Sequence, residues 1–144
     1  MTAILDDHLL RDLLADDISD ELAEILAEHE PATTNFYYLR LCKSVVTARG
    51  GSLVGSWPIE RRVALGRTLV ALPESLTIVP LRVLAYRMAE LPDTHRVSNL
   101  GAEAVAAAQH LNAPLCVWTG DDGPNIRDAV TSLGGSYRTV TRRR

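Results

Sequence analysis

The sequence has few cysteines and no long hydrophobic run. Its 144 residues include two cysteines, Cys42 and Cys116, and no CxxC pair, which argues against a zinc site. Both lie in apolar segments, so we expect reduced thiols in the core. No apolar stretch approaches the roughly 18 residues of a membrane span. The first residues lack the basic segment and apolar stretch of a signal peptide. We therefore expect a soluble cytoplasmic protein.

The net charge of −3 is not typical of a nucleic-acid-binding protein. The charges are unevenly placed, however, because the first 30 residues are acidic and the middle of the chain is basic. The basic residues that we regard as candidate contacts for a phosphate backbone are Arg40, Lys43, Arg61 and Arg62. The alternative is an ordinary solvated face.

Length and hydrophobic periodicity predict one α/β domain. Short apolar runs at 2–5, 76–79, 115–118 and 137–140 are typical of buried strands. Between them, apolar residues recur at helical spacing. We expect one helix from Ser19 that ends at Pro31, one from Thr34 or Asn35 that stops at Gly50-Gly51, one from Ser98 or Asn99 through His110, and one from Pro124. This alternation predicts a mainly parallel central sheet covered on both faces, a three-layer α/β/α architecture.

Two of the expected strands end in adjacent acids, Asp6-Asp7 and Asp121-Asp122. Because sites in such sheets lie beyond the carboxyl ends of the strands, these acids are expected to converge. Clustered carboxylates repel one another, and a Mg²⁺ or Mn²⁺ ion relieves that repulsion and can activate water against a phosphodiester. The alternative interpretation is that these residues only cap helices and form turns.

Several segments resemble the PIN nuclease family. Ala3-Ile4-Leu5-Asp6 is similar to the family's opening strand, which ends in an aspartate. The alanine-rich segment from Glu103 to Ala108, the strand Leu115–Trp118 and the following Thr119-Gly120-Asp121 are similar to its late helix, strand and Thr-x-Asp turn. Gly134 to Val140 resembles its last helix-to-strand turn. The expected domain is residues 1–141, followed by a frayed basic tail at 142–144.

The resemblance implies a three-layer PIN-like fold and an endoribonuclease that depends on Mg²⁺ or Mn²⁺ and acts on single-stranded RNA. It also implies a toxin inhibited by an antitoxin protein, and a homodimer. By resemblance, Asp6, Glu103 and Asp121 are the catalytic metal ligands, supported by Asp7, Asp122 and Asn99. The family's further acid belongs in the segment Thr33–Arg40, which contains no Asp or Glu. The alternative function is therefore a non-catalytic PIN-like module that binds a partner.

Two other families fit less of the chain. The opening Asp6-Asp7-His8 is also similar to a response-regulator receiver, but the region from Thr33 to Glu60 has no aspartate to phosphorylate and Lys43 is the only lysine. A dinucleotide-binding fold lacks its GxGxxG fingerprint. The four histidines, His8, His29, His95 and His110, are expected at the surface or at helix caps, because each has polar neighbours.

Overall fold

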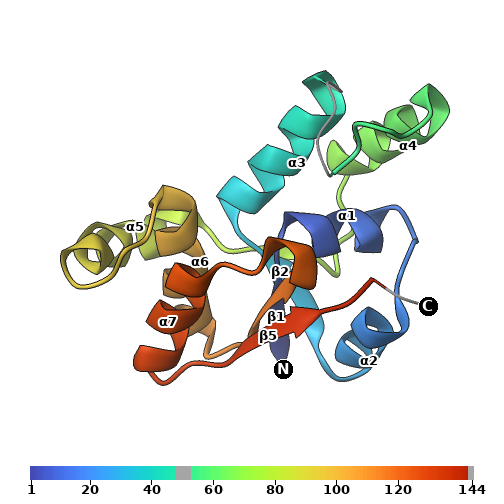
Figure 1. Ribbon diagram of the computed structural model, residues 1–144. Helices are drawn as coiled ribbons and strands as arrows, with labels where there is room; N and C mark the ends of the chain where they lie inside the picture. Colours follow the sequence, from blue (N-terminus) through green and yellow to red (C-terminus); the bar gives the residue numbers. More distant parts are fainter. Residues whose placement is uncertain (48–52, 143–144) are drawn as a thin grey trace.

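A parallel sheet forms the centre of the molecule (Figure 1). The computed structural model describes residues 1–47 and 53–142. Within these residues the sheet has five strands in the order β3-β2-β1-β4-β5, and each neighbouring pair is parallel. The strands are β1 (Thr2–Leu5), β2 (Glu30–Thr33), β3 (Thr77–Ile78), β4 (Leu115–Trp118) and β5 (Tyr137–Val140).

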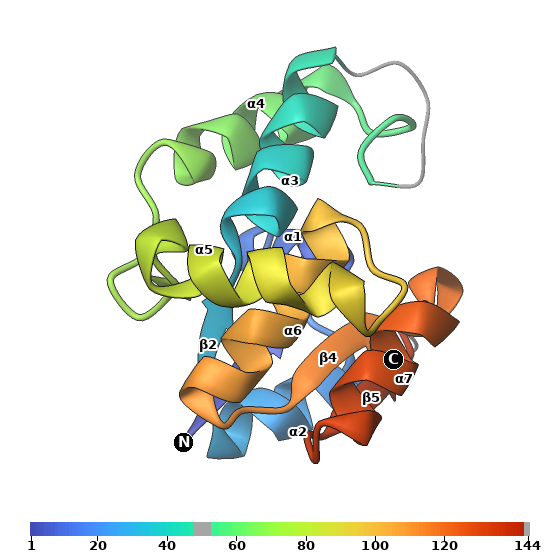
Figure 2. The same ribbon diagram turned by 90° about the vertical axis from the view of Figure 1, so that its left-hand side faces the viewer.

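Helices connect the strands and cover both faces of the sheet, which confirms the expected α/β architecture (Figures 1 and 2). They are α1 (Asp7–Leu14), α2 (Asp20–Glu28), α3 (Asn35–Thr47), α4 (Ile59–Leu69), α5 (Leu81–Glu90), α6 (Asn99–Leu111) and α7 (Pro124–Ser132). Two short 3₁₀ helices, η1 (Leu91–Asp93) and η2 (Thr119–Asp121), complete the described elements. None of the described helices has the length and apolar character that crossing a membrane requires.

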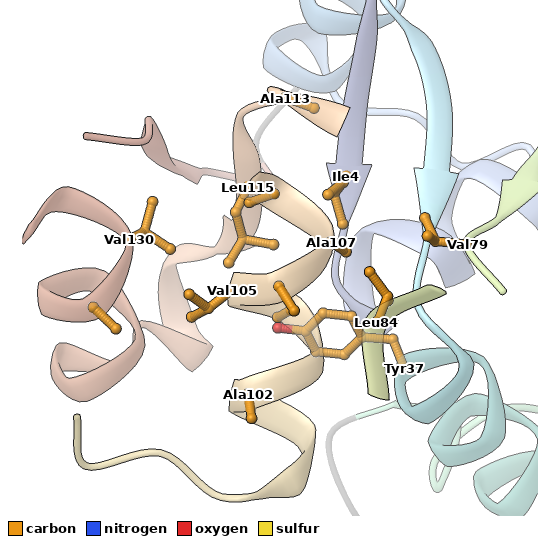
Figure 3. Close-up of a cluster of buried hydrophobic side chains, with 14 of the residues drawn as sticks. Ile4, Tyr37, Val79, Leu84, Ala102, Val105, Ala107, Ala113, Leu115 and Val130 are labelled. Carbon is orange, nitrogen blue, oxygen red and sulfur yellow. The ribbon is translucent and has the colours of Figure 1, made fainter. Parts of the chain in front are cut away.

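Side chains alternate between the two faces of the sheet, as the period of a strand requires. Ile4 and Leu115 belong to the core beneath α5, α6 and α7 (Figure 3). Their neighbours Leu5 and Cys116 belong to a second core with residues of α1 and α2. Both faces are therefore apolar, which explains why the strands read as continuous hydrophobic runs rather than as alternating ones.

A third apolar cluster lies outside these two layers and joins α1 to α3 and α4. It includes Leu10, Leu41, Leu65 and Leu69, all buried. Through it, α3 and α4 are held as a pair that extends beyond one end of the sheet (Figures 1 and 2). The end of α3 that meets the sheet follows β2, so the start of this helix lies near the carboxyl ends of the strands.

Strand β2 was not expected from the sequence, and the interpretation of Pro31 as the end of a helix was wrong. Helix α2 ends at Glu28, and Pro31 lies inside β2 opposite Ala3. The backbone N–H of Glu30 donates to Met1, so the nitrogen of Pro31 faces the other side. On that side, β3 pairs with β2 only from Ala32 onward. The missing N–H of Pro31 therefore removes no hydrogen bond between the two strands.

The expected helix starts are largely confirmed. The side chains of Ser19, Thr34 and Ser98 accept hydrogen bonds from backbone N–H groups in the first turns of α2, α3 and α6. Pro124, the expected start of the last helix, is the first residue of α7. Both cysteines are free thiols, with Cys116 buried. The expected stop at Gly50-Gly51 falls outside the described residues.

Candidate metal site

The candidate site begins at the carboxyl end of β1. Asp6 follows the strand and caps α1, since its Oδ1 accepts a hydrogen bond from the N–H of Leu9 at 2.9 Å. Its Oδ2 accepts from the N–H of Trp118 at 3.0 Å, which ties β1 to the end of β4. The side chain is buried. Capping and site formation are therefore combined in one residue, because each carboxylate oxygen has a further lone pair.

Asp6 is a carboxylic acid in an environment that disfavours its charge. Burial is the main cause and raises its pKa from 3.8 to about 7, with a smaller contribution from the neighbouring Asp7. The two backbone N–H groups act in the opposite direction and lower the pKa. A bound cation favours the ionised carboxylate, so metal binding and proton release are coupled at this side chain.

Asp7, His8 and Asp121 lie around Asp6. The Nδ1 atom of His8 is 3.1 Å from Oδ1 of Asp7 and 3.8 Å from Oδ2 of Asp121. One ligand atom from each of these four residues can be chosen so that all lie within 4.8 Å of one another. Asp7 and His8 are buried, whereas the side chain of Asp121 is 42% exposed and so opens the cluster to solvent.

Arg40 of α3 neutralises part of this negative charge. Its Nε lies 3.2 Å from Oδ2 of Asp7, and its side chain is 47% exposed. The contact is an ion pair without hydrogen-bond geometry, so the buried Oδ2 atom of Asp7 has no hydrogen-bond partner among the described residues. A buried carboxylate oxygen in this condition is costly, which leaves it available to an additional cation.

Glu103 has a different environment from the one expected of a metal ligand. It is fully buried in α6 and is not a member of the four-residue cluster. Its Oε1 accepts from the N–H of Phe36 at 2.8 Å, and its Oε2 accepts from the N–H and the side-chain amide of Asn35 at 3.1 and 2.8 Å. Both oxygens are thus committed to the first turn of α3.

The supporting residues Asp122 and Asn99 are also placed outside the cluster. Asp122 accepts a hydrogen bond from the Tyr137 hydroxyl at 2.7 Å and pairs with Arg127 at 3.1 Å. Asn99 begins α6 at an exposed position and lines a cavity of about 290 Å³ with apolar residues of α5. Of the six expected ligands, the structure brings together Asp6, Asp7 and Asp121.

Sequence reasoning missed His8, which is buried rather than at the surface. Its ring lies against Trp118 with a centroid distance of 4.5 Å. The missed signal is its position after two acids at the end of a strand, which places it in the first turn of α1. The other histidines fit the expectation better: His29, for example, is the C-cap of α2.

Tyr37 lies in the acid-free segment, in the first turn of α3. It is buried in the core beside α6 (Figure 3). Burial raises its pKa well above the ordinary value, and the charges of Asp6, Asp7 and Asp121 raise it further. The phenol is therefore neutral and close enough to the acidic cluster to sense its charge.

The four candidate phosphate contacts are divided between α3 and α4. Arg40 faces the site and Lys43 follows it one helical turn later at an exposed position. Arg61 is already engaged, because it pairs with Asp17 at 3.1 Å and stacks on Trp57 at 3.7 Å. Arg62 is partly buried on the same helix as Arg61. Of these four residues, Arg40 contacts the acidic cluster, and Lys43 follows it on the same helix.

Arg142, the last described residue, is anchored by its side chain, and the rest of the expected basic tail, Arg143 and Arg144, lies outside the described residues. The Nε of Arg142 donates to Oδ2 of Asp12 at 2.9 Å. Its guanidinium lies 5.4 Å from the centre of the Trp118 ring. Asp12 is buried and also pairs with the buried Arg11 at 2.9 Å. Arg142 thus contributes to the surroundings of the candidate site through its contact with Trp118.

The cluster is suited to a divalent cation. Carboxylate oxygens are the preferred ligands of Mg²⁺ and Mn²⁺, and an imidazole nitrogen is accepted by Mn²⁺ and later transition metals. An added positive charge would stabilise Oδ2 of Asp7, which accepts no hydrogen bond among the described residues, and the ionised form of Asp6, whose pKa is raised by burial. The cluster has three carboxyl groups and one neighbouring arginine, so its ionised form carries a net negative charge that favours binding of a divalent cation.

Comparison with solved structures supports the fold. The chain is similar to a structure described as a toxin-antitoxin complex from Klebsiella pneumoniae, with a TM-score of 0.58 and 19% identity over 98% of each chain. No protein-family model matches the sequence, and no curated protein matches it. The chain therefore shares its entire α/β fold with a component of a toxin-antitoxin complex.

Proposed function

We propose that this chain is a PIN-like, toxin-type protein that binds Mg²⁺ or Mn²⁺ and cleaves single-stranded RNA. The observation that carries the proposal is the cluster of Asp6, Asp7, His8 and Asp121 at the carboxyl ends of β1 and β4. When bound, the metal would polarise a phosphodiester and lower the pKa of its water. Asp6 and Asp121 would hold it.

The residues of this chain supply the other requirements. Arg40 lies beside the acids and is half exposed, so it is placed to contact a phosphate next to the metal. Lys43 would extend that contact along α3. The neutral Tyr37 phenol keeps a further negative charge out of the site, which favours approach of the RNA backbone.

A protein partner is part of the proposal. The similar structure is described as a toxin-antitoxin complex. Exposed apolar side chains on α3, on α4 and directly after α4 suit an antitoxin-like segment, among them Leu39, Val46, Ile59, Val63 and Val70. Exposed Leu81, Val83 and Tyr86 on α5 would suit a homodimer. Size determination of the chain alone and of the chain co-expressed with a candidate antitoxin tests both assignments.

Calorimetric titration with Mn²⁺ and incubation with single-stranded RNA test the central claim. We expect Mn²⁺ binding that is lost in Asp6→Ala and Asp121→Ala, and RNA cleavage that EDTA abolishes. Asp128→Ala is the matched control, because Asp128 is exposed on α7 outside the cluster. Folded protein that neither binds Mn²⁺ nor cleaves RNA would refute the nuclease proposal.

One observation favours a second function, a non-catalytic PIN-like module. Both carboxylate oxygens of Glu103 accept hydrogen bonds from the first turn of α3. The segment in which the PIN family carries another acid contains tyrosine and no Asp or Glu. A site reduced in this way can retain RNA or partner binding without turnover. Retarded migration of RNA with no cleavage, in the presence of saturating Mn²⁺, would select this function over the first.

A further inference from the structure

His8 is held rigidly with one ring nitrogen toward the acids. Its ring packs on Trp118, and Trp118 is in turn covered by Gly120, where a Cβ atom would come within 2.4 Å of the indole. On the other side, the backbone N–H and Nδ1 of His8 both lie at 3.0–3.1 Å from Oδ1 of Asp7. The imidazole therefore has little freedom to turn away from the cluster.

The distances from Nδ1 of His8 fit a shared coordination shell. Two ligands bound at about 2.1 Å lie roughly 3.0 Å apart when they are at right angles, and roughly 4.2 Å apart when they are opposite. The His8–Asp7 and His8–Asp121 separations are 3.1 and 3.8 Å. All four ligand atoms lie within 4.8 Å of one another, so small side-chain movements are sufficient to close the shell.

Two features of the cluster favour a bound cation. The first is the buried Oδ2 of Asp7, which is ion-paired with the half-exposed Arg40 at 3.2 Å but accepts no hydrogen bond among the described residues. The second is the mixture of donor types, since an imidazole nitrogen joins three carboxylates. Oxygen-only sites suit Mg²⁺, whereas an imidazole strengthens the binding of Mn²⁺, Co²⁺ and Zn²⁺.

We propose that Nδ1 of His8 is a metal ligand that makes this site prefer Mn²⁺, Co²⁺ or Zn²⁺ over Mg²⁺. The inference rests on the proposed metal site and adds the kind of ion that it selects. When bound, the ion would take the lone pair of this nitrogen, which lies 3.1 Å from Oδ1 of Asp7 and 3.8 Å from Oδ2 of Asp121. The rigid contact with Trp118 sets the direction of that lone pair, as supporting groups commonly do for metal-bound histidines.

The test compares affinities for Mg²⁺ and Co²⁺ in the full chain and in three variants. His8→Asn places an amide oxygen or nitrogen near the Nδ1 position, and His8→Phe keeps a ring against Trp118 but removes the donor. His110→Asn is the matched control, because His110 is exposed at the end of α6. Circular dichroism establishes that each variant folds.

We expect the wild type and His110→Asn to bind Co²⁺ about tenfold or more tightly than Mg²⁺. In His8→Asn and His8→Phe that preference should disappear while Mg²⁺ binding persists. Metal binding by the wild type with the same Co²⁺ preference in the His8 variants would overturn the role of His8 and leave the metal site standing. If the wild type binds neither Mg²⁺ nor Co²⁺, both the role of His8 and the metal site itself would be overturned.

A second measurement needs no variant. Zn²⁺ is diamagnetic, so it can be titrated into wild-type protein with ¹⁵N-labelled histidine. We expect one imidazole, the buried one beside Trp118, to lose its Nδ1–H signal and shift its Nδ1 resonance. Calorimetric saturation with Zn²⁺ and no such change in any histidine would contradict the proposal.

Discussion

Glu103 of α6 accepts two hydrogen bonds from Asn35 of α3, one from its backbone N–H and one from its side-chain amide. The same carboxylate accepts the N–H of Phe36, and the Thr34 hydroxyl accepts the N–H of Tyr37. The first three N–H groups of α3 are therefore all satisfied by side chains. A buried acid placed there also complements the positive end of the helix dipole.

The first prediction follows from this contact. Glu103→Gln replaces one acceptor oxygen by an NH₂ group that faces N–H donors, so we expect a loss of roughly 1–3 kcal/mol in the free energy of unfolding. Mn²⁺ affinity should stay unchanged. Chemical denaturation and calorimetric titration measure the two effects, with exposed Glu74→Gln as the control. A variant of normal stability that has lost Mn²⁺ binding would show that Glu103 is a ligand.

The sequence was sufficient to predict the layers, four strands and most helix starts, because each depends on local periodicity and on capping side chains. It failed at β2, since Pro31 removes an N–H and resembles a helix stop. That loss is tolerated only because β3 is short and begins opposite Ala32, a property of the neighbouring strand. The sequence of residues 30–33 does not reveal where the neighbouring strand begins, so this tolerance could not be predicted from it.

The second prediction concerns pH. Because the pKa of Asp6 is raised from 3.8 to about 7 in the folded protein, the folded state holds this proton more tightly than the unfolded state. Between pH 4 and pH 7 the unfolded chain ionises first, so the metal-free protein should lose stability as the pH rises, on the order of 4 kcal/mol from this group. Above pH 7 the loss should level off.

Asp6→Asn isolates that contribution. The amide has no proton to lose, so the stability difference between wild type and variant should change across pH 4–7, and exposed Asp128→Asn is the matched control. Urea denaturation in EDTA at several pH values is the measurement. A wild-type minus Asp6→Asn difference that stays flat over this range would contradict the raised pKa.

The site was predicted in part. Asp6 and Asp121 could be placed together because both follow strands, and the carboxyl ends of parallel strands meet at one edge of a sheet. The roles of Glu103, Asp122 and His8 could not be derived, since each depends on its spatial neighbour: the start of α3, Tyr137 and Trp118 respectively. The sequence alone does not distinguish an aspartate or glutamate that caps a helix from one that binds a metal ion.

The third prediction concerns Arg40, whose guanidinium lies beside Asp7 at 3.2 Å and competes with a metal for that carboxylate. Arg40→Met removes the competing charge and keeps an apolar stem, so Mn²⁺ affinity should rise about two- to fivefold, as a half-exposed ion pair contributes roughly 0.5–1 kcal/mol. RNA affinity should fall. Titration calorimetry and RNA binding are compared with exposed Arg82→Met. Weaker Mn²⁺ binding would mean that Arg40 organises the site instead of opposing the ion.

The fourth prediction uses two neighbouring acids of one turn as a matched pair. Asp121 lies 3.8 Å from His8 within the cluster, whereas Asp122 is occupied by the Tyr137 hydroxyl and by Arg127. Asp121→Asn should therefore lower Mn²⁺ affinity about tenfold or more, because a carboxylate provides charge as well as oxygen to the ion. Asp122→Asn should leave that affinity unchanged and reduce stability slightly, since it weakens a surface ion pair. Calorimetric titration of both variants decides between them. Equal losses of Mn²⁺ binding would mean that the turn contributes only its overall negative charge, and a loss confined to Asp122→Asn would place the metal away from the strand ends.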